Sequence, residues 1–512
     1  MNKLVLLLLC CFLINSAQSQ NKPRLKRGPY LQMVGEETVT FRWRTTIPSD
    51  SRIAVGTALG SYPIVVTDSQ LTTEHIVTLN GLTADTKYFY QIGSSNKILQ
   101  SGKHNFFVTA PDTATKRKIR IAAFGDCGRN WWGYGTMVLN AYRRYTREHP
   151  PEVLLLLGDN AYQHGTDAQY QKKFFNRYGS TILRNHALFP APGNHDYAEN
   201  PLSSRALAYY DNFTVPTNGE LGGVPSGTEA YYSYNWGNIH FVSLDSYGME
   251  DSGTTRLYDT LGAQVTWLKK DLAANQQQWT IVYWHHPPFS MGSHNSDKED
   301  ELIKIRTNLL RIVERYGVDL VLTGHSHDYE RSYLLRNYYE PEASFQPKQH
   351  AVSTSSGYYN GSTNSCPYLT TNGHTNHGIV YVVSGSAGAR GRIQKGYPHN
   401  ALPFAFNKGG MVYLEVEDNR LDVKFIGRNA NVRDQFTIMK EVQQKNNLTV
   451  KAGTPITLTA SWVGAYSWST GDTTRSITVT PTVNTNYTVQ DGSNCINDRF
   501  SITVQQTPNP KL

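Results

Sequence analysis

Short apolar runs, each followed at once by a polar turn, recur through the middle of the chain. They consist mostly of Val, Ile, Leu, Ala and Phe and lie at residues 119–124, 153–157, 187–191, 280–283 and 318–322. Runs of this length and composition are typical of strands buried on both faces of an open α/β sheet. The carboxyl ends of such strands meet in one crevice, so the polar turns are expected to gather there.

Apolar residues at helical spacing occur between these strands. Residues 262–274 and 299–316 each place apolar side chains on one face, and residues 135–148 are a further helical candidate. The strands around residues 239–244 are predicted to form a half-buried antiparallel set. Together these elements indicate two sheets packed face to face with helices outside, an α/β domain with four αββα layers over residues 117–430.

Both flanking regions predict β structure. Residues 24–111 alternate apolar and polar side chains between turns, a pattern typical of a β-sandwich of fibronectin type III or immunoglobulin type. Residues 445–506 are rich in Thr, Ser and Val and resemble the small immunoglobulin-like modules of secreted bacterial proteins. A spacer is the simplest role for this all-β module, and glycan binding or adhesion stay open. Residues 339–377 predict a long surface loop or lid, with a disordered insertion as the alternative.

Residues 1–19 have the layout of a secretion signal. Lys3 precedes an apolar stretch at residues 4–14, and small residues follow it before Gln20. That stretch is too short for a comfortable membrane span, and later apolar stretches are shorter than a spanning helix needs. We therefore expect a secreted protein without a transmembrane segment, located outside the cell, in the periplasm or on the cell surface.

Removal of that signal leaves three cysteines, Cys127, Cys366 and Cys495. Cys366 and Cys495 are candidates for a disulfide bond, but they fall in different predicted domains, so the sequence leaves the pairing open. Cys127 is next to Asp126 in a polar turn. A small packed side chain is favoured there over a thiolate ligand.

Composition narrows the class of protein. With 39% hydrophobic and 18% charged residues, the 512-residue chain is globular rather than disordered. Its net charge of +8 favours attraction of phosphate-bearing molecules. The lysines and arginines are scattered, without a basic run or an aromatic-interleaved stripe, so nucleic-acid binding is not expected.

Side chains that bind metals occupy the turns after the apolar runs. The turn sequences GDCG, GDNAY, GNHD, VYWH and GHSH supply Asp126, Asp159, Tyr162, Asn194, His285, His325 and His327. Two cations about 3.5 to 4 Å apart need an anionic side chain that touches both, hard oxygen donors and imidazole nitrogens. The glycines in these turns are expected to tolerate the unusual backbone angles of sharp turns. The sequence therefore predicts a two-metal hydrolytic centre.

In this order, the five turn sequences resemble the five blocks of the purple acid phosphatases, a branch of the calcineurin-like metallophosphoesterases. The resemblance covers residues 24–428 and includes RGPYLQ at residues 27–32, which is similar to the start of the β-sandwich that precedes the phosphatase domain in that family. Tyr162 is the residue specific to this branch, because tyrosinate bound to iron gives the family its colour. The resemblance implies a secreted acid phosphatase, a hydrolase of phosphoric monoesters.

The resemblance also implies a role for each ligand. A ferric ion would be bound by Asp126, Asp159, Tyr162 and His327. A divalent ion, Zn, Fe or Mn, would be bound by Asp159, Asn194, His285 and His325. Asp159 would bridge the two ions, and a metal-bound hydroxide would attack phosphorus in line.

Two further histidines match family positions that contact phosphate or protonate the leaving group. His195 follows Asn194 directly, whereas the residues around His294 depart from the family pattern, so the general acid is less well defined than the ligands. Asp196 either orients His195 or caps its turn. Histidines without a motif, such as His75 and His240, are expected to be structural or solvated.

Two other functions remain as alternatives. The same centre could hydrolyse phosphodiesters or nucleotides, or the chain could be a non-catalytic cell-surface binding protein with a vestigial site. The second alternative is disfavoured because all seven ligands are present. The expected partners are small phosphate esters, with cell-surface or glycan contact through the C-terminal module as an open possibility.

Overall fold

The computed structural model describes residues 22–200, 207–249 and 256–505. The predicted secretion signal lies outside these residues. The chain divides into two compact units, Met1–Pro111 with Gln171–Leu188, and Asp112–Tyr170 with Phe189–Leu512.

The first unit is built mainly of antiparallel strands, β1 (Leu25–Gln32), β2 (Thr38–Gly56), β3 (Ile64–Asn80), β4 (Lys87–Ser94), β5 (Lys97–Gln100) and β6 (Phe106–Val108). The long strand β2 pairs with β1, β3 and β4. His75 stacks on Trp43 with ring centroids 4.6 Å apart, and its two ring nitrogens each lie 2.9 Å from a hydroxyl, those of Thr45 and Ser51. His75 is therefore a structural histidine, as expected.

A segment from later in the chain completes this unit. Residues 171–188 form short helical turns that pack with β1. The Arg27 guanidinium lies 3.7 Å from the centre of the Phe175 ring, and its Nε donates to Gln171. The sequence pattern did not predict this association, because nothing local links the two segments.

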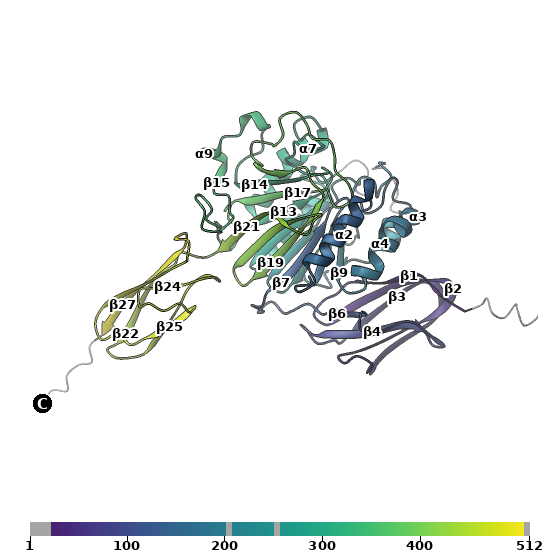
Figure 1. Cartoon of the computed structure of the whole chain (residues 1–512), viewed down its shortest axis with the longest axis horizontal. Helices are drawn as coiled ribbons and strands as arrows, with labels where there is room; N and C mark the ends of the chain where they lie inside the picture. The colour runs from purple at the N-terminus through teal and green to yellow at the C-terminus, as the bar shows by residue number, and fades with distance from the viewer. Residues whose placement is uncertain (1–21, 201–206, 250–255, 506–512) are drawn as a thin grey trace, which may run out of the picture. The chain divides into compact units, whose positions relative to one another are not determined.

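The second unit contains two large mixed sheets (Figure 1). One has the order β16-β21-β20-β19-β7-β8-β9, with β16 (Tyr368–Thr370), β21 (Val432–Lys440), β20 (Arg420–Gly427), β19 (Gly410–Glu417), β7 (Ile119–Phe124), β8 (Val153–Leu157) and β9 (Ala187–Ala191). The other has the order β10-β11-β12-β13-β17-β14-β15, with β10 (Tyr232–Trp236), β11 (Ile239–Ser243), β12 (Trp279–Tyr283), β13 (Leu320–Thr323), β17 (Ile379–Ser384), β14 (Tyr329–Leu335) and β15 (Ala351–Ser353), and β18 (Phe404–Phe406) pairs with β14.

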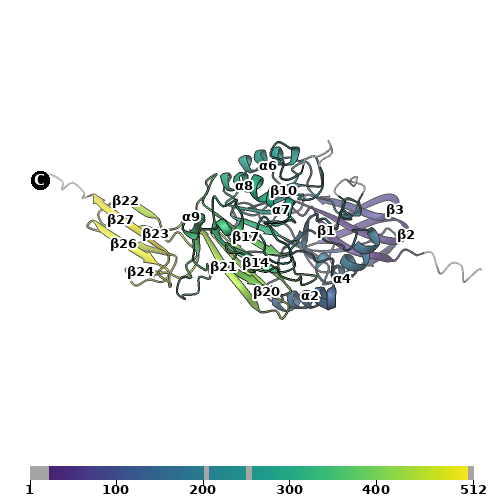
Figure 2. The same cartoon turned by 90° about the horizontal axis from the view of Figure 1, so that it is seen from above.

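Few helices accompany these sheets. Helix α2 (Tyr134–Tyr145) packs on β19 and β20. Figure 2 shows α6 (Ala263–Ala274), α7 (Asp300–Lys304) and α8 (Leu310–Arg315) together beside the second sheet. A π-helical turn, Ile305–Leu309, joins α7 to α8, so the predicted helix at residues 299–316 is wider in its middle. These helical segments contribute Leu268, Leu309 and Val313 to one buried core. The same core contains Val282 of β12 and Val321 of β13.

The mixed sheets, the small number of helices and the additional β structure agree with the predicted fold class, and the four-layer order stays a prediction. Within the described ranges, the helices are too short or too polar to cross a membrane.

Two local predictions were only partly right. Strand β11 was expected in a half-buried antiparallel set, but it is fully buried and pairs parallel with β12, while only its β10 edge is antiparallel. The stretch at residues 339–377 is largely loop, but it is not a disordered insertion, because β15 pairs with β14 and β16 pairs with β21. It thus contributes an edge strand to each sheet. Its sequence lacks a period because these strands are only three residues long.

The C-terminal module contains β22 (Lys445–Lys451), β23 (Ile456–Thr459), β24 (Ser467–Trp468), β25 (Ser476–Val479), β26 (Thr485–Gln490) and β27 (Asn497–Gln505). Its buried core includes Trp462, Trp468 and Phe500, and also Met439 from β21. Cys366 and Cys495 form a disulfide bond across 129 residues. The module is therefore joined to the region around β16 and β21 by a shared core and by a disulfide bond.

Removing this bond tests its contribution. Either Cys366→Ser or Cys495→Ser should lower the free energy of unfolding of the module by about 2–4 kcal/mol, because a long closed loop restricts the unfolded chain. Denaturant unfolding under oxidising conditions measures the change. The double variant is the matched control and should lose no more than either single variant. Wild-type stability in both single variants would contradict a stabilising role.

Candidate metal centre

The turns after β7, β8, β12 and β13 are joined to one another by backbone hydrogen bonds. The Asp126 N–H donates to the Gly158 carbonyl at 3.1 Å, and the Gly324 N–H donates to the His285 carbonyl at 3.0 Å. The His325 N–H donates to Oδ2 of Asp126 at 2.8 Å. The carboxyl ends of these strands therefore meet, as the sequence predicted.

The glycines were expected to adopt the unusual backbone angles of these turns, but the ligands themselves adopt most of them. Of the four glycines that precede ligands, Gly158 alone has a positive φ, of 86°, whereas the ligands Asp126, Asp159 and His325 themselves have φ values of 57°, 54° and 66°. The glycines are needed for close approach instead. A Cβ on Gly193 would lie 2.3 Å from Oδ1 of Asp159. Non-glycine residues held at such angles cost roughly 1–3 kcal/mol each and cluster at functional sites.

Three of the predicted ligands form one group. The Tyr162 hydroxyl donates to Oδ1 of Asp126 at 2.7 Å, and Nε2 of His327 lies 3.2 Å from each of these two oxygen atoms. Asp126 and Tyr162 are buried. The three potential metal-ligand atoms, two oxygens and one imidazole nitrogen, thus lie close together.

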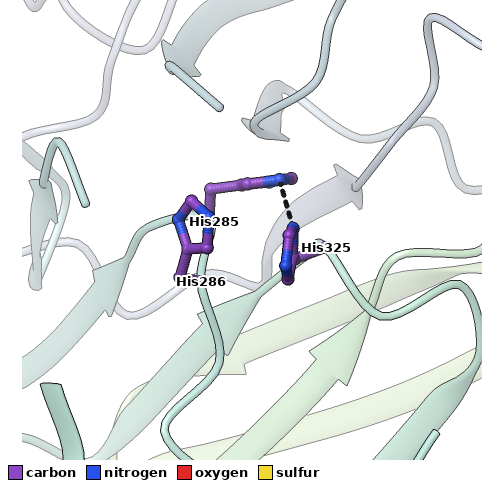
Figure 3. Close-up of side chains that lie close together, drawn as sticks. All are labelled: His285, His286 and His325. Atoms are coloured by element: carbon purple, nitrogen blue, oxygen red, sulfur yellow. Dashed lines mark hydrogen bonds between the residues drawn. The ribbon is translucent and has the colours of Figure 1, made fainter. Parts of the chain in front are cut away.

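The other four predicted ligands adjoin this group. His285 Nε2 lies 3.1 Å from Oδ1 of Asn194, 3.4 Å from Oδ2 of Asp159 and 3.2 Å from Nδ1 of His325. Figure 3 shows the rings of His285 and His325 turned toward one another. Nδ1 of His285 donates to the Leu157 carbonyl at 2.8 Å, which leaves Nε2 as the atom that presents a lone pair.

This donor set fits a pair of cations. Asp126, Asp159 and His285 place one ligand atom each within 4.8 Å of one another, and all three are buried. Burial lowers the pKa of His285, but the Asp159 and Asp126 carboxylates outweigh this and raise it to about 9. Burial and the same carboxylates raise the pKa of Tyr162 well above its usual value. A cation among these atoms would offset the buried negative charge and favour the phenolate.

His195 and His294 border the group from different sides. The His195 ring lies 4.3 Å from the Tyr162 ring, and its Nδ1 is 2.8 Å from the Gln163 carbonyl. The His294 ring lies 3.7 Å from the His325 ring, and its side chain is 33% exposed. Both rings are therefore beside predicted ligands and reachable from solvent, as a group that protonates a leaving group must be.

Asp196 fastens two turns together. Its buried carboxylate accepts from the backbone N–H groups of Gly193 and Asn160 at 2.9 and 3.1 Å, and from the Tyr170 hydroxyl at 2.5 Å. Burial and the nearby Asp159 carboxylate raise the pKa of Asp196 above its usual value. These contacts match the turn-capping role.

Sequence reasoning missed one carboxylate at this centre. Glu299 Oε2 accepts from Nδ1 of His294 at 2.8 Å and lies 3.8 Å from Nε2 of His325, and Oε1 accepts from the Asn295 N–H at 2.7 Å. Burial raises its pKa, but its hydrogen bonds with the two histidines outweigh this and lower it. A sequence signal existed, because Glu299 follows His294 by five residues, but it was assigned only to a helix start.

His286 lies next to the predicted ligand His285 in the sequence. It is buried beside His285 and His325, and its Nδ1 lies 2.9 Å from the Ser246 hydroxyl. Burial and the neighbouring imidazoles lower its pKa well below its usual value. A neutral imidazole held in this way supports the neighbouring rings.

Known proteins resemble the chain in this region. Residues 119–329 match the calcineurin-like phosphoesterase family. Purple acid phosphatase 15 of Arabidopsis thaliana is 29% identical over 288 residues, 52% of this chain and 50% of that protein. Acid phosphatase type 7 of Mus musculus is 26% identical over 391 residues, 70% of this chain and 77% of that protein. The chain spans about half the length of the first of these relatives.

Two solved structures share the fold. Purple acid phosphatase PPD1 from yellow lupin (Lupinus luteus) seeds has a TM-score of 0.59 at 17% identity, over 80% of this chain and 74% of that chain. PhoD has a TM-score of 0.53 at 12% identity, over 95% of this chain and 94% of that chain.

The matched region is thus a calcineurin-like metallophosphoesterase domain. The relatives named above are acid phosphatases, in agreement with the resemblance of the turn sequences to the purple acid phosphatases.

Proposed function

We propose that the chain is a secreted acid phosphatase that uses two metal ions to hydrolyse phosphate monoesters. The observation that supports this most directly is the convergence of seven donor side chains, from five separate segments, on one partly buried cluster. The relatives named as acid phosphatases point to the same class of reaction. A binding protein with a vestigial site would not need to keep every donor in this arrangement.

Each ion would have its own ligands. Asp126, Tyr162 and His327 would hold a ferric ion, and Asn194, His285 and His325 would hold a zinc, iron or manganese ion, with Asp159 between the two. Carboxylate and phenolate suit a hard trivalent ion, whereas imidazole and amide suit a borderline divalent ion. When bound, the ions would activate a water molecule and neutralise the phosphoryl oxygens.

The protein's own side chains would orient the ester and supply a proton. His195 and His294 stand on the solvent side of the cluster, with side chains 12% and 33% exposed. Glu299 accepts from Nδ1 of His294 and so fixes the orientation of that ring. One of these two imidazoles would bind a phosphoryl oxygen, and the other would protonate the departing alkoxide.

Secretion agrees with the cysteine chemistry. The disulfide between Cys366 and Cys495 forms and persists in oxidising compartments rather than in a reducing cytosol. Export would bring the enzyme into contact with external phosphate esters.

Visible absorption tests the ferric assignment. The purified protein should show a broad charge-transfer band, and Tyr162→Phe should abolish it because the phenolate is the donor of that transition. Absorption spectra with metal analysis measure both. Tyr90→Phe, which alters a buried tyrosine of the first unit, is the control and should keep the band. A colourless wild-type enzyme that is fully active with zinc alone would refute the ferric ion.

Substrate class is tested with paired esters. p-Nitrophenyl phosphate should be hydrolysed with a kcat/KM at least about tenfold above that of bis-p-nitrophenyl phosphate, a difference of about 1.4 kcal/mol in activation free energy. Prolonged chelation should remove the activity and added metal should restore it. The reverse preference would favour the phosphodiesterase alternative, and activity that survives complete metal removal would exclude a metal mechanism.

Substitution separates the two histidines from the ligands. His195→Ala and His294→Ala should each lower kcat by about 10²–10⁴-fold, the usual contribution of a general acid or base, with both ions still bound. Steady-state kinetics and metal analysis on the same samples provide the test. His104→Ala, an exposed histidine of the first unit, is the control. Loss of a metal ion in either variant would make that residue a ligand instead.

A further inference from the structure

Two adjacent tryptophans are exposed on the loop that follows Asp126. Trp131 is 53% exposed and Trp132 is 86% exposed, whereas the other seven of the nine tryptophans are at most 6% exposed. Large aromatic side chains normally contribute to a core or an interface. Their exposure here therefore needs an explanation beyond folding.

Hydrogen bonds fix the backbone of the loop that carries these rings. The Gly128 N–H donates to the Asp159 carbonyl at 3.2 Å, and the Trp131 N–H donates to the Gly388 carbonyl at 3.2 Å. Oδ1 of Asn130 accepts from the Thr136 N–H at 3.1 Å at the start of α2. Trp132 has a φ of 50°, an angle that side-chain-bearing residues rarely adopt. The exposure of the rings is thus built into an ordered turn.

Arg129 connects the tryptophans to the metal centre. Its guanidinium carbon lies 4.6 Å from the centre of the Trp131 ring and 4.9 Å from the centre of the Tyr162 ring. Both distances are within the range of cation–π attraction. A single guanidinium therefore separates an exposed indole from a proposed iron ligand.

We propose that Trp131 and Trp132, with Arg129, form a subsite for the leaving group and select phosphate esters whose leaving group contains a planar aromatic ring. This inference rests on the proposed phosphatase function. The metal cluster would fix the phosphoryl group, so the rest of the ester must extend outward past the cluster's rim, where Arg129 and the Trp131 indole lie and Trp132 is the next residue along the chain. An aromatic ring stacks on an exposed indole without needing specific hydrogen bonds, and the shared chemistry includes nucleosides and aryl groups.

Kinetics with three monoesters test the subsite. The leaving groups of adenosine 5′-monophosphate and p-nitrophenyl phosphate each contain an aromatic ring, the adenine base and the nitrophenyl ring. The leaving group of glycerol 2-phosphate contains none. In Trp131→Ala and Trp132→Ala, the ratio of kcat/KM for an aromatic ester to that for glycerol 2-phosphate should fall by about tenfold, within the range of one lost stacking contact. Trp132→Phe should recover most of the ratio. Leu71→Ala, another exposed apolar side chain at 70% exposure, is the control and should leave the ratio unchanged.

Inhibitor binding gives a readout independent of turnover. Phenylphosphonate should inhibit the wild-type enzyme more strongly than methylphosphonate, and Trp131→Ala should reduce that preference by a similar factor. A fall in the ratio for adenosine 5′-monophosphate alone would support the subsite and assign it to nucleosides, and a fall for p-nitrophenyl phosphate alone would assign it to aryl esters.

Two results would overturn the subsite. An equal loss for all three esters would show a structural role for the tryptophans, and an unchanged ratio in both alanine variants would show no role in selection. If the wild-type enzyme hydrolyses glycerol 2-phosphate with the same kcat/KM as the aromatic esters, this inference fails while the proposed function stands. If it hydrolyses none of the three, the proposed function itself fails.

Discussion

Close contact between five turns, those after β7, β8, β9, β12 and β13, is the constraint on which the metal centre depends. Donor atoms from distant segments can share one small volume only if the chains that carry them nearly touch, and Gly193 and Gly324 leave no room for a side chain. The ligands Asp126, Asp159 and His325 accept left-handed backbone angles, and interlocking hydrogen bonds such as that from His325 to Asp126 offset the cost. Rigid placement of this kind prepares the donors before any ion arrives.

Local sequence signals predicted much of this arrangement. Strands β7, β8 and β9 begin and end at the predicted residues, because a buried strand needs a continuous apolar run and the polar turn after it ends that run. The ligands lie in those turns, so predicting the strands also placed the seven side chains near one another. The predicted antiparallel pairing was wrong between β11 and β12, which pair parallel. Pairing depends on which strand lies alongside, and the residue pattern of one segment carries no such information.

Other features could not be read from the sequence because they join distant segments. The packing of residues 171–188 with β1 and the bond between Cys366 and Cys495 depend on chain paths that no local pattern encodes. Glu299 and Arg129 are close in sequence to site residues, but their contacts with the His294 and Tyr162 rings are visible only in the folded chain. The turn sequences supplied the ligands and the family resemblance divided them between two ions, whereas neither indicated Glu299 or Arg129.

The bond between Cys366 and Cys495 also bears on how the protein would fare among extracellular proteases. The connection between β21 and β22 is exposed at Gln443. A single cut there would break the polypeptide without releasing the roughly 70 residues that follow Gln443, because the disulfide bond would still hold both fragments. The nicked protein would migrate as one species until a reducing agent was added. Durability after cleavage is therefore a property of this architecture that the peptide backbone alone would not provide.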